Sequence, residues 1–474
     1  MKDKIRVLWL CNIIIPQAAS KLGIKAGTGG GWLNQLSDIF DKRDDIELCI
    51  VAPYLEGKEL CHIKFGEDSE FYGFQKEISE PWKYDASVEK VFFHIIAEFK
   101  PDIIHIFGTE FPHSLSMVKV FNNPAKTVIH VQGIISAISK HYEAFLPGDV
   151  VRKYSFRDFI RRDNIEKQKR KFELRGEYET EAIKKAAHVF HRTDWEEAVI
   201  REINPNINLH YVQEMMRGSF YSGRWKHENC ESHSIFISQG NYPLKGLHIM
   251  LEALKHVKER YERVKLYIAG DDILSVNSLK EKLREGYYSQ YIRELIKKWN
   301  LTENVKFTGN LSEEEMKQRY LQSNVFASAS SIENSSNSIA EAMLLGVPTV
   351  ASFVGGCSSL IEHGVIGYLY QADAPYMLAY YVCKIFENKE LSVKLGNNAA
   401  LRAEARYDRE VIVEDIINGY ESMFSAHDAF SQNDVGIQRF FARRDYGVAF
   451  FGAIIKFVGF YKRIIFIRFV AFSA

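Results

Sequence analysis

The chain has 474 residues, more than one ordinary hydrophobic core accommodates, so we expect two or three domains. Its residues are 46% hydrophobic and 26% charged, which is typical of a globular protein. Because the formal net charge is zero, no overall field favours nucleic acid as a partner.

In the first half of the chain, short apolar runs alternate with segments of helical periodicity. This alternation predicts parallel strands covered on both faces by helices. The predicted strands are residues 6–11, 47–52, 103–107, 127–131 and 188–190. The predicted helices include residues 32–41, 88–99 and 113–121.

A glycine-rich turn, residues 25–32, joins the first predicted strand to a helix. Glycines there let the backbone approach a ligand closely, and the helix N-terminus offers N–H groups to a phosphate. The turn is neither a GxGxxG nor a Walker A loop, and a flexible turn without a ligand is the alternative interpretation. The glycines concerned are Gly27, Gly29, Gly30 and Gly31.

The alternation restarts after residues 222–233, which are polar and lack periodicity, so a domain boundary is predicted there. Two doubly wound domains leave a crevice at their strand ends, where ligands bind. Predicted strands are residues 234–238, 264–269, 305–307, 324–327 and 349–351, and predicted helices are residues 247–257, 288–297, 312–322 and 338–345.

Lys245 leaves the first strand of this second half and stands at the entrance to a helix. A lysine at that place can meet a diphosphate as a point charge. A solvated loop lysine is the alternative interpretation.

Two glutamates flank a predicted helix start in residues 331–350. Glu333 lies in a polar loop, and Glu341 follows eight residues later inside the helix, for which Asn337 or Ser338 is the expected N-cap. Donor phosphates would accept N–H bonds at that helix start, and each carboxylate can accept the protons of a sugar diol. Taken singly, a loop acid and a surface helix residue are the alternatives.

The spacing Glu-x7-Glu from Glu333 to Glu341, the following EAMLLGVPTVAS and the lysine–glycine pair at Lys245 together resemble the retaining glycosyltransferases of family four. The similarity spans roughly residues 5–424 and includes LYIAGDD, NVKFTGNLSEEEM and ASASSIENS. It implies the α/β GT-B fold, in which two Rossmann-like doubly wound domains face a central cleft. Residues 1–221 are expected to form the acceptor-side domain and residues 222–425 the nucleotide-sugar domain, whose final helix packs back on the first.

The resemblance also assigns roles to individual residues. Glu333 is expected to contact the donor sugar, Glu341 the ribose, and Lys245 the diphosphate. The phosphate cradle corresponds to the N–H groups of Asn337, Ser338 and Ile339, the N-terminal glycine loop to Gly30 and Gly31, and the paired glycines after a strand to Gly355 and Gly356. Independently of the resemblance, Thr109, Glu110 and His113 follow the strand at 103–107 and precede a helix, so they are expected to project into the cleft, where an acceptor hydroxyl would lie.

The chain departs from the family pattern at two positions. Gly240 stands where many members carry a second diphosphate-binding arginine. Gln132 stands where many carry a histidine near the reacting carbon, and His130, two residues earlier, is an alternative candidate on the same face. Arg192 and Arg217 are expected either to supply the missing positive charge or to form interdomain salt bridges, and the sequence does not decide between these.

We therefore expect a hexosyltransferase that moves a sugar from a nucleoside diphosphate sugar, UDP-linked by family habit, to a hydroxyl acceptor in polysaccharide or glycolipid assembly. Retention at the anomeric carbon follows from the resemblance. No DxD motif occurs, so no essential metal and no cofactor are expected. One alternative is a non-catalytic nucleotide-sugar-binding subunit that activates a partner, and a sugar epimerase is a third, less favoured class.

Residues 436–474 form a basic, aromatic tail with seven basic residues and one acid. Its apolar runs are too short to span a bilayer, so interfacial membrane attachment is expected. Residues 140–175 also combine basic and aromatic side chains, which fits either a membrane-facing surface or a solvated helix. Six scattered cysteines without metal-like spacing indicate a reducing compartment, so we expect a cytoplasmic enzyme, peripheral on the inner face of the plasma membrane.

Overall fold

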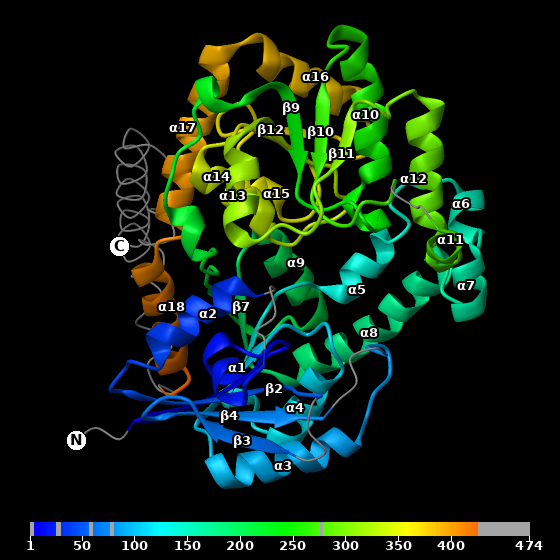
Figure 1. The fold of residues 1–474 in the computed structure, drawn as a ribbon. Coiled ribbons are helices and arrows are strands. Elements are labelled where there is room, and N and C mark those ends of the chain that lie inside the picture. The colour runs from blue at the N-terminus through cyan, green and yellow to red at the C-terminus, as the bar shows by residue number, and fades with distance from the viewer. Residues whose placement is uncertain (1–3, 25–29, 56–59, 76–79, 275–277, 425–474) are drawn as a thin grey trace, which may run out of the picture. The chain divides into compact units, whose positions relative to one another are not determined.

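The computed structural model describes residues 4–24, 30–55, 60–75, 80–274 and 278–424 (Figure 1). The chain divides into a compact unit, Met1–Ile417, and a second unit, Asn418–Ala474, of which only residues 418–424 are described. The predicted tail at 436–474 lies outside the described residues. The two sheets and the candidate site all belong to the first unit.

Two sheets form the framework, and each contains neighbours that are distant in sequence. The first has the order β3-β4-β2-β1-β5-β6-β7-β8 and the second β11-β10-β9-β12-β13-β14. All ladders are parallel except β3–β4, so the predicted doubly wound α/β class is confirmed. The first sheet contains β1 Ile5–Leu10, β2 Ile46–Pro53, β3 Cys61–Lys64, β4 Ser69–Phe74, β5 Ile103–Phe107, β6 Thr127–His130, β7 His188–His191 and β8 Asn208–Tyr211. The second contains β9 Glu231–Ile237, β10 Lys265–Ile268, β11 Val305–Phe307, β12 Ser323–Ser328, β13 Thr349–Ser352 and β14 Tyr368–Tyr370.

Helices connect these strands, as parallel pairing requires. In the first half they are α1 Pro16–Leu22, α2 Gly31–Phe40, α3 Ser87–Phe99, α4 His113–Phe121, α5 Ile135–Ile138, α6 Gly148–Arg152, α7 Phe156–Arg161, α8 Ile165–Lys185 and α9 Asp194–Ile203. In the second half they are α10 Leu247–Arg260, α11 Leu279–Arg284, α12 Tyr287–Lys298, α13 Glu313–Leu321, α14 Asn337–Leu345, α15 Cys357–Leu360, α16 Pro375–Glu387, α17 Lys389–Arg406 and α18 Arg409–Ser422. Short 3-10 turns occur at Pro124–Lys126, Ser139–His141, Gly218–Tyr221, His227–Asn229 and Pro243–Lys245.

The second sheet shows why its strands have nearly continuous apolar sequences. Along β9, Ile235 and Ile237 pack into the hydrophobic cluster that contains α10, α12 and α16. Phe236 points the other way, into the cluster that contains α14 and α17. Because helices cover both faces, both sides of each strand must be apolar.

The order of the strands fixes where a ligand can bind. The direction of winding reverses between β1 and β5 in the first sheet and between β9 and β12 in the second. Crevices in doubly wound sheets open beyond the carboxyl ends of such strands. The loops that follow β9 and β12 carry Lys245 and Glu333, and the loop that follows β5 carries Glu110.

One segment of the first half packs on the second sheet. Residues 139–164, here called the crossover segment, contribute Tyr142, Leu146 and Val150 to the core cluster of the second sheet. The carbonyl of Ala144 lies 2.7 Å from Nε2 of His248 on α10. Figure 1 shows α6 and α7 beside α12 and α11, in agreement with their contacts. The strands divide at the predicted boundary near residue 222, but this earlier segment joins the two halves.

Asp158 anchors the crossover segment. Its carboxylate completes a capping box with Ser155 at the start of α7 and accepts the backbone N–H of Tyr287 at 2.7 Å. The residue is only 3% exposed, so its bonds have no competition from water. The side chain thus holds α7 against the start of α12.

We expect Asp158→Ala to destabilise the protein by about 1–3 kcal/mol, because a helix cap is lost and a buried N–H is left unpaired. Thermal unfolding monitored by circular dichroism measures this as a lower midpoint. Asp149→Ala, at an exposed position on α6, is the matched control and should leave the midpoint unchanged. An equal midpoint for Asp158→Ala would contradict the anchoring role.

Candidate functional site

The loop after β9 delivers Lys245 to the crevice. The 3-10 turn Pro243–Lys245 ends at Gly246, whose φ of +65° and whose approach to Ala329 leave no room for a Cβ atom. Gly246 then caps α10, so the lysine side chain is fixed at a strand–helix junction, as predicted.

Glu333 meets Lys245 directly. Its Oε1 lies 2.6 Å from the ammonium nitrogen and also accepts the hydroxyl of Ser330 at 2.6 Å. Burial lowers the pKa of Lys245, but the Glu333 carboxylate and Tyr242 together raise it above its ordinary value, so the lysine is charged at neutral pH. Residues 88 apart in sequence therefore form one ion pair at the sheet edge.

The start of α14 lies beside this pair. The helix begins at Asn337, and its N-cap is Ser336, whose side chain makes no capping hydrogen bond. The prediction of Asn337 or Ser338 as the cap is wrong, because both already have helical positions in the first turn. The N–H groups of the first turn have no partner within the helix and carry partial positive charge. An uncapped start of this kind suits an anion.

Glu341, one turn further along α14, pairs with Arg217. Nε and one terminal nitrogen of the guanidinium lie 2.6 and 2.8 Å from the two carboxylate oxygens, a bidentate contact. Arg217 precedes the first strand of the second sheet, and Glu341 lies on α14, which follows β12 of that sheet, so this pair bridges the two halves of the chain. Burial raises the pKa of Glu341, and Arg217 offsets part of that rise.

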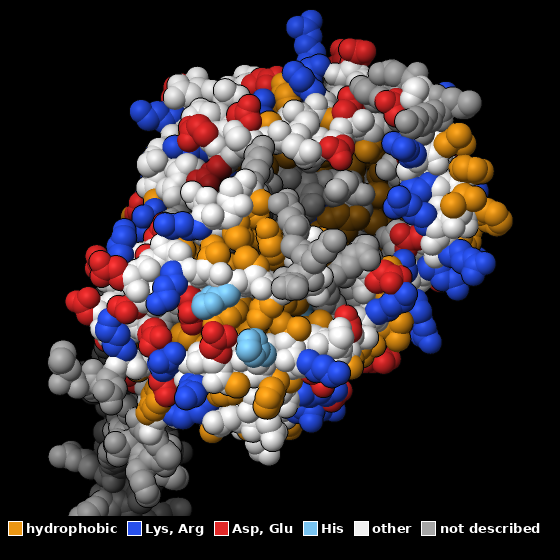
Figure 2. All heavy atoms as spheres, turned by 60° about the horizontal axis from the view of Figure 1, so that its bottom comes forward, with side chains coloured by type: hydrophobic (Ala, Val, Ile, Leu, Met, Phe, Trp, Pro, Cys, Tyr) orange, Lys and Arg blue, Asp and Glu red, His pale blue; other side chains and the backbone are white. Residues whose placement is uncertain are grey.

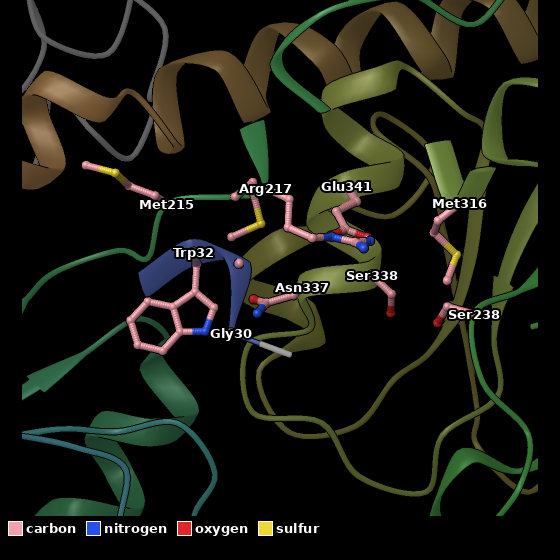
Figure 3. Close-up of a pocket in the computed structure, with 11 residues that line it drawn as sticks. Gly30, Trp32, Met215, Arg217, Ser238, Met316, Asn337, Ser338 and Glu341 are labelled. Atoms are coloured by element: carbon pink, nitrogen blue, oxygen red, sulfur yellow. The ribbon is translucent and has the colours of Figure 1, made fainter. Parts of the chain in front are cut away.

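A cavity of about 290 Å³ opens at the start of α14 (Figure 3). In Figure 3 the Arg217 side chain points at Glu341, and Asn337 and Ser338 are drawn below this pair. A second, smaller pocket is lined by Lys245 and Glu333 and shares Ser238 and Ser338 with the first, so the two adjoin. The larger cavity is lined by Gly30, Gly31, Trp32, Met215, Met216, Arg217, Ser238, Met316, Asn337, Ser338 and Glu341.

The predicted glycines stand at close approaches. Gly30 is the N-cap of α2 with φ +71°, and a Cβ on Gly31 would lie 2.8 Å from Cγ of Arg217. Cβ atoms on Gly355 and Gly356 would overlap the carbonyl oxygens of Glu333 and Asn334. The first pair thus faces the cavity and the second supports the Glu333 loop. Gly27 and Gly29 lie outside the described residues.

Arg192 does not reach the cavity. It is 2% exposed and pairs with Glu196 at 2.8 Å and Glu214 at 2.7 Å, both also buried. A buried charge needs such partners, and they occupy the guanidinium. The sequence left open whether the two arginines supply charge to the ligand site or form salt bridges. Arg192 belongs to a buried network of ion pairs. Arg217 forms a salt bridge between the two halves and also lines the cavity.

His130 and Gln132 also differ in their surroundings. His130 is buried among aromatic rings that include Trp32, Phe107 and Phe190, and burial lowers its pKa well below the usual value. The amide of Gln132 donates to Glu214. Neither residue lines the two pockets described above. Ile339, in the predicted cradle, has a buried side chain, so only its backbone can serve a ligand.

On the predicted acceptor side, only Glu110 keeps some exposure. Thr109 and His113 are 2% and 1% exposed, so their predicted projection into the cleft is wrong. The Thr109 hydroxyl donates to Glu179 at 2.7 Å, and the His113 ring bonds to Asn12. Burial raises the pKa of Glu110 to about 7.

Gly240, where an arginine was expected, is buried. A Cβ there would lie 2.9 Å from Leu247 and 3.1 Å from Ile268, which are core side chains. An arginine at this position would therefore enter the core rather than the cavity. Sequence reasoning missed the cavity residues Ser238, Met216 and Met316, since no local pattern marks residues that only the tertiary fold brings to α14.

The part of the chain described by the structure contains no cluster of three or more His, Cys, Asp or Glu arranged to hold a metal ion. Within the same residues, no helix is long and apolar enough to cross a bilayer.

Residues 223–402 match the family model described as "Glycosyl transferases group 1", which agrees with the glycosyltransferase resemblance drawn from the motifs in that part of the chain. A phosphatidyl-myo-inositol mannosyltransferase of Mycobacterium leprae is 27% identical over 191 residues, 40% of this chain and 46% of that protein. The chain thus spans less than half the length of the curated relatives it matches.

Solved structures share the fold. Sucrose-phosphate synthase from Thermosynechococcus elongatus aligns with a TM-score of 0.66 at 16% identity, over 89% of this chain and 100% of that one. The Anabaena protein HepE in complex with UDP-glucose aligns with a TM-score of 0.60 at 17% identity, over 88% of this chain and 100% of that one. The architecture is therefore GT-B, as expected.

Glu110 makes the stability of the protein depend on pH. Its folded pKa of about 7 exceeds the ordinary value of 4.5, so the folded state binds more protons than the unfolded state between these values. Stability from this group is complete below about pH 4.5 and falls as the pH rises to about 7. We expect Glu110→Gln to raise the unfolding midpoint relative to wild type more at pH 8 than at pH 5. Glu202→Gln, at an exposed position, is the control. An equal gain at both pH values would contradict the assignment.

Proposed function

We propose that the protein is a retaining glycosyltransferase that transfers a hexose-type unit from a nucleoside diphosphate sugar to a hydroxyl acceptor, without an essential metal ion. One observation carries this proposal: the uncapped start of α14 opens into a cavity flanked by Lys245–Glu333 and Arg217–Glu341. Helix starts with nearby cations bind phosphates, and carboxylates bind sugar hydroxyls.

The diphosphate is placed against the N–H groups of Asn337, Ser338 and Ile339, with Glu341 accepting ribose hydroxyls and Glu333 those of the sugar. Lys245 and Arg217 supply positive charge. Arg217 replaces the diphosphate-binding arginine that many family members carry at the position of Gly240. The acceptor oxygen bonds to the anomeric carbon as the sugar–phosphate bond breaks. The hydroxyl proton passes to the departing phosphate oxygen. Helix dipole and cations stabilise the charge that develops on that leaving group.

Support for UDP comes from the family resemblance and from the UDP-glucose complex of the similarly folded Anabaena protein. A lipid-linked or saccharide acceptor is consistent with the mannosyltransferase relative, whose name specifies a phosphatidylinositol substrate. We place the enzyme in the cytoplasm, at the inner face of the plasma membrane. The six free cysteines support a reducing compartment.

A panel of nucleotide sugars, scored by the shift in thermal unfolding, identifies the donor, since a ligand of the folded state stabilises it by mass action. Slow hydrolysis of the stabilising donor then separates an enzyme from a non-catalytic binding subunit. Stabilisation by no nucleoside diphosphate sugar would contradict the proposal. Stabilisation without hydrolysis or transfer would favour the binding subunit.

We expect Lys245→Ala to lower kcat by about 10²–10³-fold, because the charge that develops on the diphosphate loses a preorganised partner. Initial rates with the donor found in the panel provide the measurement. Lys394→Ala, at an exposed position on α17, is the control. A full rate in Lys245→Ala would remove this lysine from the mechanism.

Arg217 is tested by separating its two roles. Arg217→Ala should destabilise the protein, because Glu341 is left buried and unpaired, and should weaken donor binding by about 10–100-fold. Adding Glu341→Gln should restore the unfolding midpoint, while the donor should bind the double variant more weakly than it binds Glu341→Gln alone. If the double variant bound the donor as tightly as Glu341→Gln alone, the arginine would be an interdomain bridge alone.

A further inference from the structure

The short helix α7 has its apolar and polar faces reversed. Phe156, Phe159 and Ile160, at positions i, i+3 and i+4, lie on one side of the helix and are 57%, 70% and 65% exposed. Asp158, on the opposite side, is 3% exposed and holds the helix to Tyr287. A helix packed for stability alone would bury the apolar side and leave the acid in water.

The crossover segment exposes two further aromatic side chains. Phe145 and Tyr154 are 52% and 41% exposed, and Leu283 on α11, which contacts α7, is 42% exposed. Along the right-hand rim of the molecule in Figure 2, hydrophobic side chains protrude among those of Lys and Arg; α7 lies on that side in Figure 1. Clusters of exposed large apolar side chains indicate an interaction surface.

Basic side chains surround this surface. Arg152, Lys153, Arg161 and Arg162 are exposed within the same segment. Of its four acids, Asp158 is buried, Glu143 and Asp163 are partly buried and paired with lysines of α8, and Asp149 is exposed on α6. We call the apolar residues and these four cations the α7 patch. Aromatic side chains that enter a headgroup region, ringed by cations that attract anionic lipids, are the features of an interfacial membrane site.

We propose that the α7 patch docks the protein on an anionic lipid surface, with Phe156, Phe159 and Ile160 entering the interface. A second copy of this chain is disfavoured, because a two-fold interface would set Arg161 and Arg162 against the same charges. The chain's own tail, residues 436–474, is basic and is disfavoured for the same reason. This site is separate from the proposed donor cavity and does not depend on it.

The fold connects the patch to the proposed catalytic cleft. Early in the crossover segment, the carbonyl of His141 accepts the hydroxyl of Ser331, which lies in the loop that carries Glu333. Asp158 fixes α7 at the other end of the segment. A surface-bound α7 would thus be held rigidly to the loop that is proposed to bind the donor sugar, which suits an acceptor delivered from the lipid.

The first test reads the depth of α7 directly in the full-length chain. Phe159→Trp is mixed with phosphatidylglycerol–phosphatidylcholine vesicles that have brominated acyl chains, which quench tryptophan only at short range. We expect quenching well above that of wild type, lost with pure phosphatidylcholine. Tyr376→Trp, at an exposed position on α16, is the matched control and should match wild type. Equal quenching for both variants would overturn the proposal, whatever the tail contributes.

A second variant tests the energetic role. Phe159→Asp with Ile160→Asp should lower partition to the anionic vesicles by about tenfold or more, because apolar burial and charge attraction are both reduced. Tyr376→Asp with Tyr380→Asp is the control. Sedimentation velocity without lipid tests whether the patch binds a second copy of the chain instead. A wild-type dimer that the α7 variant abolishes would assign the patch to that contact and overturn the proposal.

Discussion

The amino end of α14 is the feature on which the rest of the site depends. Its first N–H groups have no partner within the helix and no side-chain cap from Ser336, and they face a cavity. Backbone donors at such a place need an acceptor, and the helix dipole favours a negatively charged one. Because α14 follows β12, its start lies at the switch point between β9 and β12, where a doubly wound sheet opens a crevice.

The two ion pairs beside that helix start share one logic. A cation held near a phosphate site must be neutralised when it is buried, and Glu333 and Glu341 do this for Lys245 and Arg217. The same carboxylates are the groups that would accept sugar hydroxyls. Charge balance in the folded protein and recognition of the proposed donor therefore use the same side chains. Arg217 and Glu341 come from different halves of the chain. Their ion pair therefore makes the geometry of the site depend on how the two halves are held together.

Much of this architecture was predictable from sequence, for reasons visible in particular elements. β5 has the predicted bounds because a strand buried on both faces is a continuous apolar run. β3 and β8 were missed because their side chains are partly exposed at the two edges of the sheet. The family motifs predicted that Lys245 and Glu333 lie at the same site. The bond between Arg217 and Glu341, 124 residues apart, was not predicted, since no local pattern encodes it. The packing of the crossover segment against the second sheet was not predicted either, for the same reason.

Hydrogen exchange at the start of α14 tests the central claim most directly. The amides of Asn337, Ser338 and Ile339 would be followed by mass spectrometry of peptides covering residues 335–341, with and without a nucleoside diphosphate. The account predicts slower exchange in these peptides on addition of the nucleotide, and unchanged exchange in α3. Nucleotide binding that left exchange at the start of α14 unaltered would contradict it.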